Sequence, residues 1–386
     1  MTRRPLSPRG KIALLCSSHF INDIHSAFLN TFIPVIIANL GISVARAGGL
    51  QALSGAIHIC CQPLLGFLAD RSSRPIPVIV GPLLAALGSS MLPLAPSYGA
   101  ALLLTGLWGL GSATFHPQGH GAVGLVSPSG RLAFNISLFS VAGMLGGTLS
   151  PLYALSLKKL VGYRLLPLAA LVPVTLLGLL TWRFLARFDD DEKPAGTFRL
   201  GDVGRSLSVV FRKIYRVWAI SVTRDTAFQA TRFFLPLVVT ASGGGLGQIG
   251  TILFFMMAAG TLSPLIGGHL SDAFGKERVL FVILLATPLC LVPAALLSGL
   301  PSYVLFIVGT ALINATQPIT AAMGQEAAPE ARSTASSIVM GLSWGLGGFA
   351  MAPLGYLADR AGLTTTLVVI GLLPLLSLPF LRRRTA

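Results

Sequence analysis

Gly66-Phe67-Leu68-Ala69-Asp70 ends one long apolar run of the chain, and Gly268-His269-Leu270-Ser271-Asp272 ends another in its second half. Basic residues follow both copies, and a third copy, Gly355-Tyr356-Leu357-Ala358-Asp359, is followed by Arg360. Glycine lets two helices approach closely, and a carboxylate at a helix end can hold a neighbouring helix by charge. A single copy reads equally well as a helix stop, whereas paired copies indicate a duplicated chain. We expect a gating role for Gly66, Asp70, Arg71, Arg74, Gly268, Asp272, Asp359 and Arg360.

The composition indicates a bilayer protein. Of 386 residues, 53% are hydrophobic and only 11% are charged, with a mean hydropathy of +0.77, whereas soluble proteins carry about 25% charged residues. A spanning helix needs about 20 mostly apolar residues. The sequence therefore predicts an all-α membrane protein with twelve transmembrane helices. The predicted spans are 12–40, 46–69, 76–96, 98–125, 131–157, 164–186, 214–241, 247–271, 278–298, 301–325, 332–358 and 363–381.

A polar stretch separates six spans from six. We expect an N-terminal six-helix half (1–186), a cytoplasmic linker (187–213) with a short amphipathic helix near 203–211, and a C-terminal six-helix half (214–386). If the N-terminus lies inside, the inside segments hold 21 Lys or Arg and the outside segments hold 5. Cytoplasmic loops carry such an excess. Both termini are therefore predicted to be cytoplasmic, in a cell inner (plasma) membrane.

Other protein classes fit the sequence poorly. The net charge of +15 could suggest nucleic-acid binding, but the basic residues lie in short connectors and form no compact basic domain. Four cysteines lie inside apolar runs, without metal-ligand spacing or a disulfide framework. A phosphate loop and a nucleophile elbow are also missing from the sequence. We expect no enzyme activity, cofactor, metal or nucleic acid; the expected partners are a small-molecule substrate, protons and the lipid bilayer, and the protein is expected to be a monomer.

The segment from Gly66 to Arg74 resembles the signature loop of the major facilitator superfamily. That loop runs Gly, three residues, Asp, Arg and then a basic cluster, and Ser72 stands where a glycine is usual. The twelve predicted spans and the central linker agree with this superfamily along the whole chain. The resemblance implies two halves that move about a site near the bilayer midplane, lined by spans 1, 4, 7 and 10.

Further motifs resemble the fosmidomycin resistance protein family. They are Ser-His-Phe-Ile-Asn-Asp at 18–23, Gly-Ser-Ala-Thr-Phe-His-Pro at 111–117, Arg-Phe-Phe-Leu-Pro-Leu at 232–237, Gly-Gln-Glu-Ala-Ala-Pro at 324–329 and Gly-Leu-Ser-Trp-Gly-Leu-Gly-Gly at 341–348. This resemblance implies efflux of a drug or metabolite driven by proton antiport. Gln118 stands where that family often has a glutamate, so a titratable group is missing at that position.

Polar residues in span 1 form one helical stripe: His19, Asn22, Asp23, Ser26 and Asn30. Ionisable residues inside a span are costly unless they face a cavity or a partner. We expect Asp23 to carry the coupling proton. His19 and His116 are the alternatives, because imidazole titrates near neutrality. A purely structural pair between Asp23 and a basic residue of another span remains open.

Span 7 carries a second stripe, formed by Asp225, Gln229 and Arg232, with Arg224 about 100° away around the helix. Because guanidinium binds carboxylate or phosphonate in a two-pronged fashion, the two arginines favour an anionic substrate. The alternative is that Asp225 and Arg232 neutralise each other. The residues expected to bind substrate are Asn22, Asn30, His58, Gln118, His120, Arg224, Asp225, Gln229, Arg232 and Gln317.

These observations favour a secondary active transporter that exports a small, anionic drug or metabolite by proton-coupled alternating access. An importer or uniporter of an organic anion is the first alternative, and a membrane sensor that no longer transports is the second. The direction of solute flux under an imposed pH gradient distinguishes the first two, and a correctly folded protein without any flux would support the third.

Overall fold

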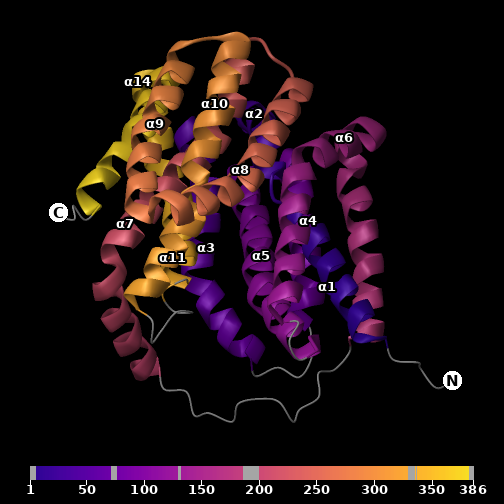
Figure 1. Ribbon diagram of the computed structural model, residues 1–386. Coiled ribbons are helices and arrows are strands. Elements are labelled where there is room, and N and C mark those ends of the chain that lie inside the picture. Colours follow the sequence, from indigo (N-terminus) through magenta and orange to yellow (C-terminus); the bar gives the residue numbers. More distant parts are fainter. Residues whose placement is uncertain are drawn as a thin grey trace. The chain divides into compact units, whose positions relative to one another are not determined.

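The computed structural model describes residues 6–70, 76–128, 132–185, 200–328, 335 and 337–381, which are helical almost throughout (Figure 1). No strand occurs within these ranges. The chain divides into two compact units by its internal contacts. The first comprises residues 1–41 and 57–195, and the second comprises residues 42–56 and 196–386. One helix, α3, therefore contributes to both units.

The first unit is built from apolar helices. They are α1 (Pro8–Asp23), α2 (Phe28–Leu40), the later part of α3 (Val44–Asp70), α4 (Ile76–Met91), the 3-10 turn η1 (Leu92–Leu94), α5 (Tyr98–Val126) and α6 (Leu132–Phe184). Gly162 breaks α6 with a positive φ of 70°, a backbone conformation that glycine adopts at low cost. This break lies between the predicted spans 131–157 and 164–186.

The second unit contains the remaining helices and the first turns of α3. They are α7 (Leu200–Ala241), α8 (Leu246–Phe274), α9 (Lys276–Leu296), α10 (Gly299–Asn314), α11 (Gln317–Ala327), the π-helical η4 (Ser337–Leu342), α13 (Ser343–Phe349), α14 (Met351–Leu372) and the 3-10 segment η5 (Leu373–Phe380). Gly362, at φ 84°, breaks α14 between the predicted spans 332–358 and 363–381.

Within the described residues, each predicted span is largely helical, but turns at 24–27 and 315–316 divide the spans 12–40 and 301–325 into two helices each. Six helical segments there are long and apolar enough to cross a membrane, and 78–94 is a shorter apolar helix. The predicted linker is partly helical, because α7 already begins at Leu200 and runs without interruption into the span. The amphipathic helix expected near 203–211 is thus the first part of α7, where Val210 and Ile214 pack against Val339.

Backbones approach closely where the first turns of α3 meet α13 and α14, all inside the second unit. A Cβ on Gly55 would lie 2.5 Å from the carbonyl oxygen of Gly345, and one on Gly48 would lie 2.2 Å from that of Met351. Only residues without a Cβ allow such contact, as in other small-residue helix pairs of membranes. We call this contact the α3–α14 seam.

Candidate functional site

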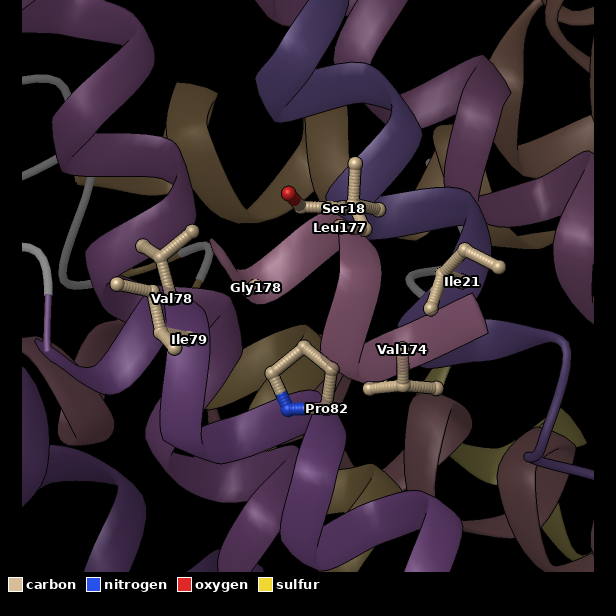
Figure 2. A pocket seen from close by; sticks show the side chains of 8 residues that line it. All are labelled: Ser18, Ile21, Val78, Ile79, Pro82, Val174, Leu177 and Gly178. Atoms are coloured by element: carbon tan, nitrogen blue, oxygen red, sulfur yellow. The ribbon is translucent and has the colours of Figure 1, made fainter. Parts of the chain in front are cut away.

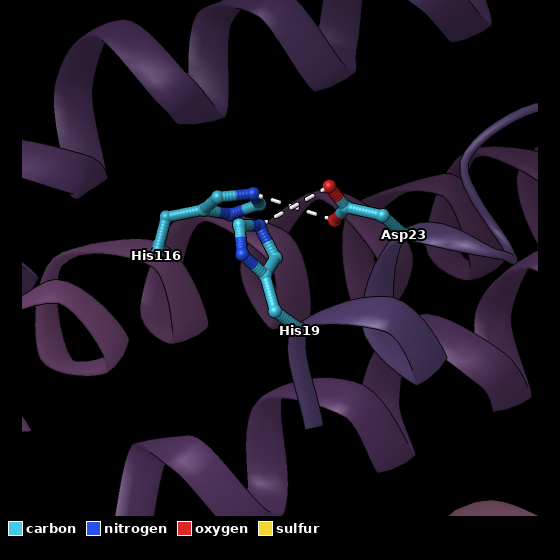
Figure 3. A group of neighbouring side chains, drawn as sticks. All are labelled: His19, Asp23 and His116. Atoms are coloured by element: carbon cyan, nitrogen blue, oxygen red, sulfur yellow. Dashed lines mark ion pairs between the residues drawn. The ribbon is translucent and has the colours of Figure 1, made fainter. Parts of the chain in front are cut away.

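A partly buried cluster joins α1 and α5 within the first unit. Asp23 Oδ2 lies 3.2 Å from His19 Nε2, and Asp23 Oδ1 lies 3.4 Å from His116 Nε2 (Figure 3). The side chain of His19 is 6% exposed, whereas those of Asp23 and His116 are 21% and 28% exposed. The structure therefore brings together the three residues predicted to handle the proton. Access to the cluster lies on the side of Asp23 and His116.

The far nitrogens of both rings are fixed by backbone carbonyls. His19 Nδ1 lies 2.8 Å from the carbonyl oxygen of Phe139, and His116 Nδ1 lies 2.8 Å from that of Ser112. A carbonyl oxygen only accepts hydrogen bonds, so each Nδ1 must carry hydrogen and donate. Each Nε2 then faces the carboxylate of Asp23 with a lone pair unless it binds a further proton.

Close helix packing gives His19 its position. Its ring lies against that of Phe139, with centroids 4.1 Å apart, and 5.3 Å from the ring of His116. A Cβ on Gly143 would lie 2.3 Å from His19 Nε2, so α6 admits this ring only because residue 143 is glycine. Asn22 supports the carboxylate by donating from Nδ2 to Asp23 Oδ1 at 2.9 Å.

The atoms of His19, Asp23 and His116 that could bind a metal ion all lie within 4.8 Å of one another. Two imidazole nitrogens and a carboxylate oxygen could serve a proton or a transition-metal ion alike. The two Nε2 lone pairs and the carboxylate oxygens of Asp23 would repel one another, so a positive charge between them stabilises the arrangement.

Other predicted residues of the first unit lie apart from this cluster. Asn30 is buried on α2, and its Oδ1 has no hydrogen-bond partner. His58 contacts Ser112 through Nε2 and Oγ at 3.3 Å. Gln118 is buried, and its Oε1 accepts a hydrogen bond from the backbone N–H of Val78 at 3.0 Å. The side chain of His120 lies outside the described residues.

A small cavity lies between α1, α4 and α6 (Figure 2). Its lining is apolar apart from Ser18, whose hydroxyl donates to the carbonyl oxygen of Leu14. None of the predicted site residues lines it. The cavity therefore reflects imperfect helix packing and contributes nothing to the site; the other lining residues are Ile21, Val78, Ile79, Pro82, Val174, Leu177 and Gly178.

In the second unit, Arg224 and Asp225 pair with each other. The guanidinium donates from Nε and Nη2 to the two carboxylate oxygens, both at 2.9 Å, and from Nη1 to Thr320 at 2.8 Å. Ser343 donates to Asp225 Oδ2 at 2.6 Å. Arg224 also contacts another helix, since Thr320 lies on α11. The pairing of Arg224 with Asp225 was not predicted, because neighbouring side chains leave a helix about 100° apart. The long, flexible arginine side chain spans this offset.

Arg232 is placed differently. It is 7% exposed, its Nε has no hydrogen-bond partner, and its guanidinium carbon lies 5.6 Å from the ring centre of Phe228. Asp225 is engaged by Arg224, so it does not neutralise Arg232. Gln229 donates from Nε2 to the carbonyl oxygen of Trp344 at 2.7 Å, and Gln317 is half-buried at the start of α11.

The structure describes some of the residues that were predicted to have a gating role and leaves out others. Asp359 accepts hydrogen bonds from the backbone N–H groups of Val44 and Ala45, both at 2.8 Å, and Arg360 lies 5.3 Å from the ring centre of Tyr356. Gly268 faces Pro318 loosely, and Asp272 is exposed. The structure does not describe Arg71 and Arg74. For Gly66 and Asp70 it describes only the helical backbone.

Sequence reasoning missed the groups that hold the predicted residues in place. The carbonyl oxygens of Phe139 and Ser112 and the N–H groups of Val44 and Ala45 belong to the backbone, which every residue possesses. No side-chain pattern marks them. Gly143 gave the only usable signal, because it belongs to a run of small residues in span 5.

The chain is similar to proteins named as transporters or resistance proteins. The chain is 27% identical to the uncharacterized MFS-type transporter YfnC of Bacillus subtilis, over 93% of this chain and 89% of the relative. It is 26% identical to the fosmidomycin resistance protein of Escherichia coli, over 96% of this chain and 91% of the relative. The predicted resemblance is thereby confirmed.

Solved structures share the fold at low sequence identity. A bacterial homolog of the human lysosomal transporter Spinster, in an inward-facing and occupied conformation, superposes with a TM-score of 0.79 at 16% identity, covering 96% of this chain and 95% of that chain. The nucleoside transporter NupG superposes with a TM-score of 0.78 at 15% identity, covering 97% of this chain and all of that chain.

The family assignment agrees with the predicted fold class. The model of the Major Facilitator Superfamily matches residues 15–352. The long apolar helices indicate a multi-pass membrane protein, and transporters of this kind carry small-molecule substrates. The chain belongs to the Major Facilitator Superfamily.

Proposed function

We propose that this protein exports a small drug or metabolite in exchange for protons, by alternating access in a cell inner membrane with both termini cytoplasmic. The observation that carries the proposal is the contact of Asp23 with the Nε2 atoms of His19 and His116. The sequence relatives add support, since one is named for fosmidomycin resistance and others for multidrug resistance.

The cluster suits a proton carrier because its protonation changes its net charge. With each Nδ1 donating to a carbonyl, two neutral rings and an ionised Asp23 place three acceptors together at a net charge of −1. One added proton gives an Asp–imidazolium pair and removes the charge, and a second makes it positive. A site of this kind binds protons when it is open to an acidic compartment. It releases them when it opens to a less acidic compartment, or when a cationic group approaches the carboxylate.

Gating is proposed to involve Asp359 and the α3–α14 seam. The carboxylate of Asp359 sits at the N-terminus of α3 and accepts from two N–H groups that lack partners within their own helix. In the proposed orientation this end of α3 faces outside. The contact would hold the outer ends of α3 and α14 together while solute has access from the cytoplasm, and it must open for release.

Flux into liposomes tests the proposal. Vesicles with an acid interior and an internal pH dye are expected to lose protons when fosmidomycin or members of a panel of drugs, phosphonates and carboxylates are added outside, and to accumulate the active compounds. Asp23→Asn should abolish both effects. Glu277→Gln, a carboxyl change at the start of α9, is the matched control and should retain them.

Other outcomes identify the alternatives. Full gradient-driven flux in Asp23→Asn would remove Asp23 from the mechanism. Solute that enters the vesicles together with protons would indicate an importer. Solute flux that does not depend on the pH gradient would indicate a uniporter. A chelator in all buffers tests whether a metal ion, rather than a proton, occupies the cluster, because metal dependence would make the wild-type flux collapse.

A further inference from the structure

Arg232 is a buried cation without a counter-ion. It is 7% exposed on α7, and Nε has no hydrogen-bond partner. Among the described residues, no carboxylate lies within ion-pair distance of it. Its neighbour is the ring of Phe228, 5.6 Å from the guanidinium carbon. An aromatic face attracts a cation but supplies neither a hydrogen-bond acceptor nor a full negative charge.

The same helix shows how the fold treats a structural arginine. Arg224, 1% exposed, fills its donor groups with both oxygens of Asp225 and with Thr320. Arg232 lies two turns further along α7 and has none of these partners. A guanidinium does not become neutral in a protein, and a buried charge is unfavourable unless it is paired. The difference between the two arginines indicates that the partner of Arg232 comes from outside the chain.

The surroundings of Arg232 indicate the chemical class of that partner. The rings of Phe228 and Trp344 lie with centroids 6.0 Å apart, and Gln229 fixes the backbone of Trp344 through its carbonyl oxygen. A planar fork of donors beside the ring of Phe228, which in turn lies near the ring of Trp344, suits a compact oxyanion attached to an apolar body.

We propose that Arg232 binds the anionic group of the transported solute, and that the substrates are organic anions with one carboxylate or phosphonate group and an apolar or aromatic body. This inference rests on the proposed function, because it names the substrate class of the exporter. Phe228 and Trp344 then contact the apolar body, and Arg224 and Asp225 only hold α7 against α11 and α13.

Equilibrium binding tests the inference without any pH gradient. The purified protein is placed in nanodiscs of phosphatidylcholine alone, which removes anionic lipid as a source of the counter-ion. Affinities are measured for pairs of equal shape that differ in charge, such as phenylacetate and phenylacetamide, together with the corresponding phosphonates and inorganic phosphate. The wild type is expected to bind the aromatic anions about tenfold or more tightly than their neutral partners, as a charge-assisted contact implies.

Variants of Arg232 assign the preference. Arg232→Gln should bind anion and amide about equally, and Arg232→Lys should keep part of the preference because it keeps the charge but loses the fork. Arg216→Gln, an exposed arginine of the same helix, is the control and should behave as the wild type. Arg232→Lys also keeps the test valid if Arg232→Gln does not fold.

Several results would overturn the inference: equal binding of anions and amides by the wild type, an unchanged preference in Arg232→Gln, or a preference that appears only when anionic lipid is present. Tight binding of inorganic phosphate with no gain from an aromatic body would contradict the proposed substrate class. Asp23→Asn should retain the anion preference, so a failure of proton coupling and a failure of this inference give different results.

Discussion

Asp359 Oδ1 accepts a 2.8 Å hydrogen bond from the backbone N–H of Val44, and this contact joins two positions 315 residues apart in the chain. The second oxygen accepts from the next N–H group, that of Ala45. The carboxylate, which belongs to α14, therefore caps the first turn of α3 alongside Ser43, whose hydroxyl accepts from the N–H of Arg46.

Asp359→Ala is expected to loosen the first turn of α3. Loss of an N-cap costs about 1 kcal/mol, or roughly a fivefold change in population. Hydrogen exchange of the amides at residues 44–50 should therefore become faster in bilayer-reconstituted protein, with the rest of α3 little changed. Glu277→Gln should leave this exchange unaltered. Unchanged protection in Asp359→Ala would show that the seam, rather than the carboxylate, holds this turn.

Asp225→Asn is expected to destabilise the fold rather than to change substrate choice. It removes the ionised partner of Arg224, and breaking a buried pair from one side costs about 3–5 kcal/mol. The midpoint of thermal unfolding in detergent should fall clearly. Replacing both residues, as in Arg224→Met with Asp225→Leu, should be milder than the single change. A stable Asp225→Asn protein with altered affinity for the anion panel would instead return this pair to the substrate site.

Gly143→Ala is expected to displace His19. The new Cβ would meet Nε2 at 2.3 Å, so the ring must leave Asp23 or α6 must move away from α1. Proton-driven flux in the acid-interior liposomes should fall strongly while anion binding at Arg232 persists. Gly121→Ala on α5, where a Cβ would meet nothing within 4 Å, is the control. Normal flux in Gly143→Ala would show that the position of His19 is not important for coupling.

The sequence predicted the helices well, because apolar runs of spanning length and the excess of basic residues in connectors are properties of the chain alone. It also predicted one side of the cluster, since His19 and Asp23 are four residues apart on one helix. Whether His116 joins them depends on how α5 packs against α1, which spacing does not determine. Asp225 and Arg232 lie on one stripe, as expected, yet the acid pairs with its immediate neighbour, because Ser343 and Thr320 from other helices complete that arrangement.

The imidazole nitrogens themselves report most directly on the proposed proton site. Solid-state NMR of the protein in bilayers, labelled with ¹⁵N-histidine and assigned with His19→Gln and His116→Gln, can follow both rings between about pH 5 and pH 9. We expect Nδ1 to keep its hydrogen in both rings throughout, and the Nε2 signals of the cluster to change with pH in a way that Asp23→Asn alters. A hydrogen on Nε2 with a bare Nδ1, or spectra that do not change with pH, would contradict the proposed proton site.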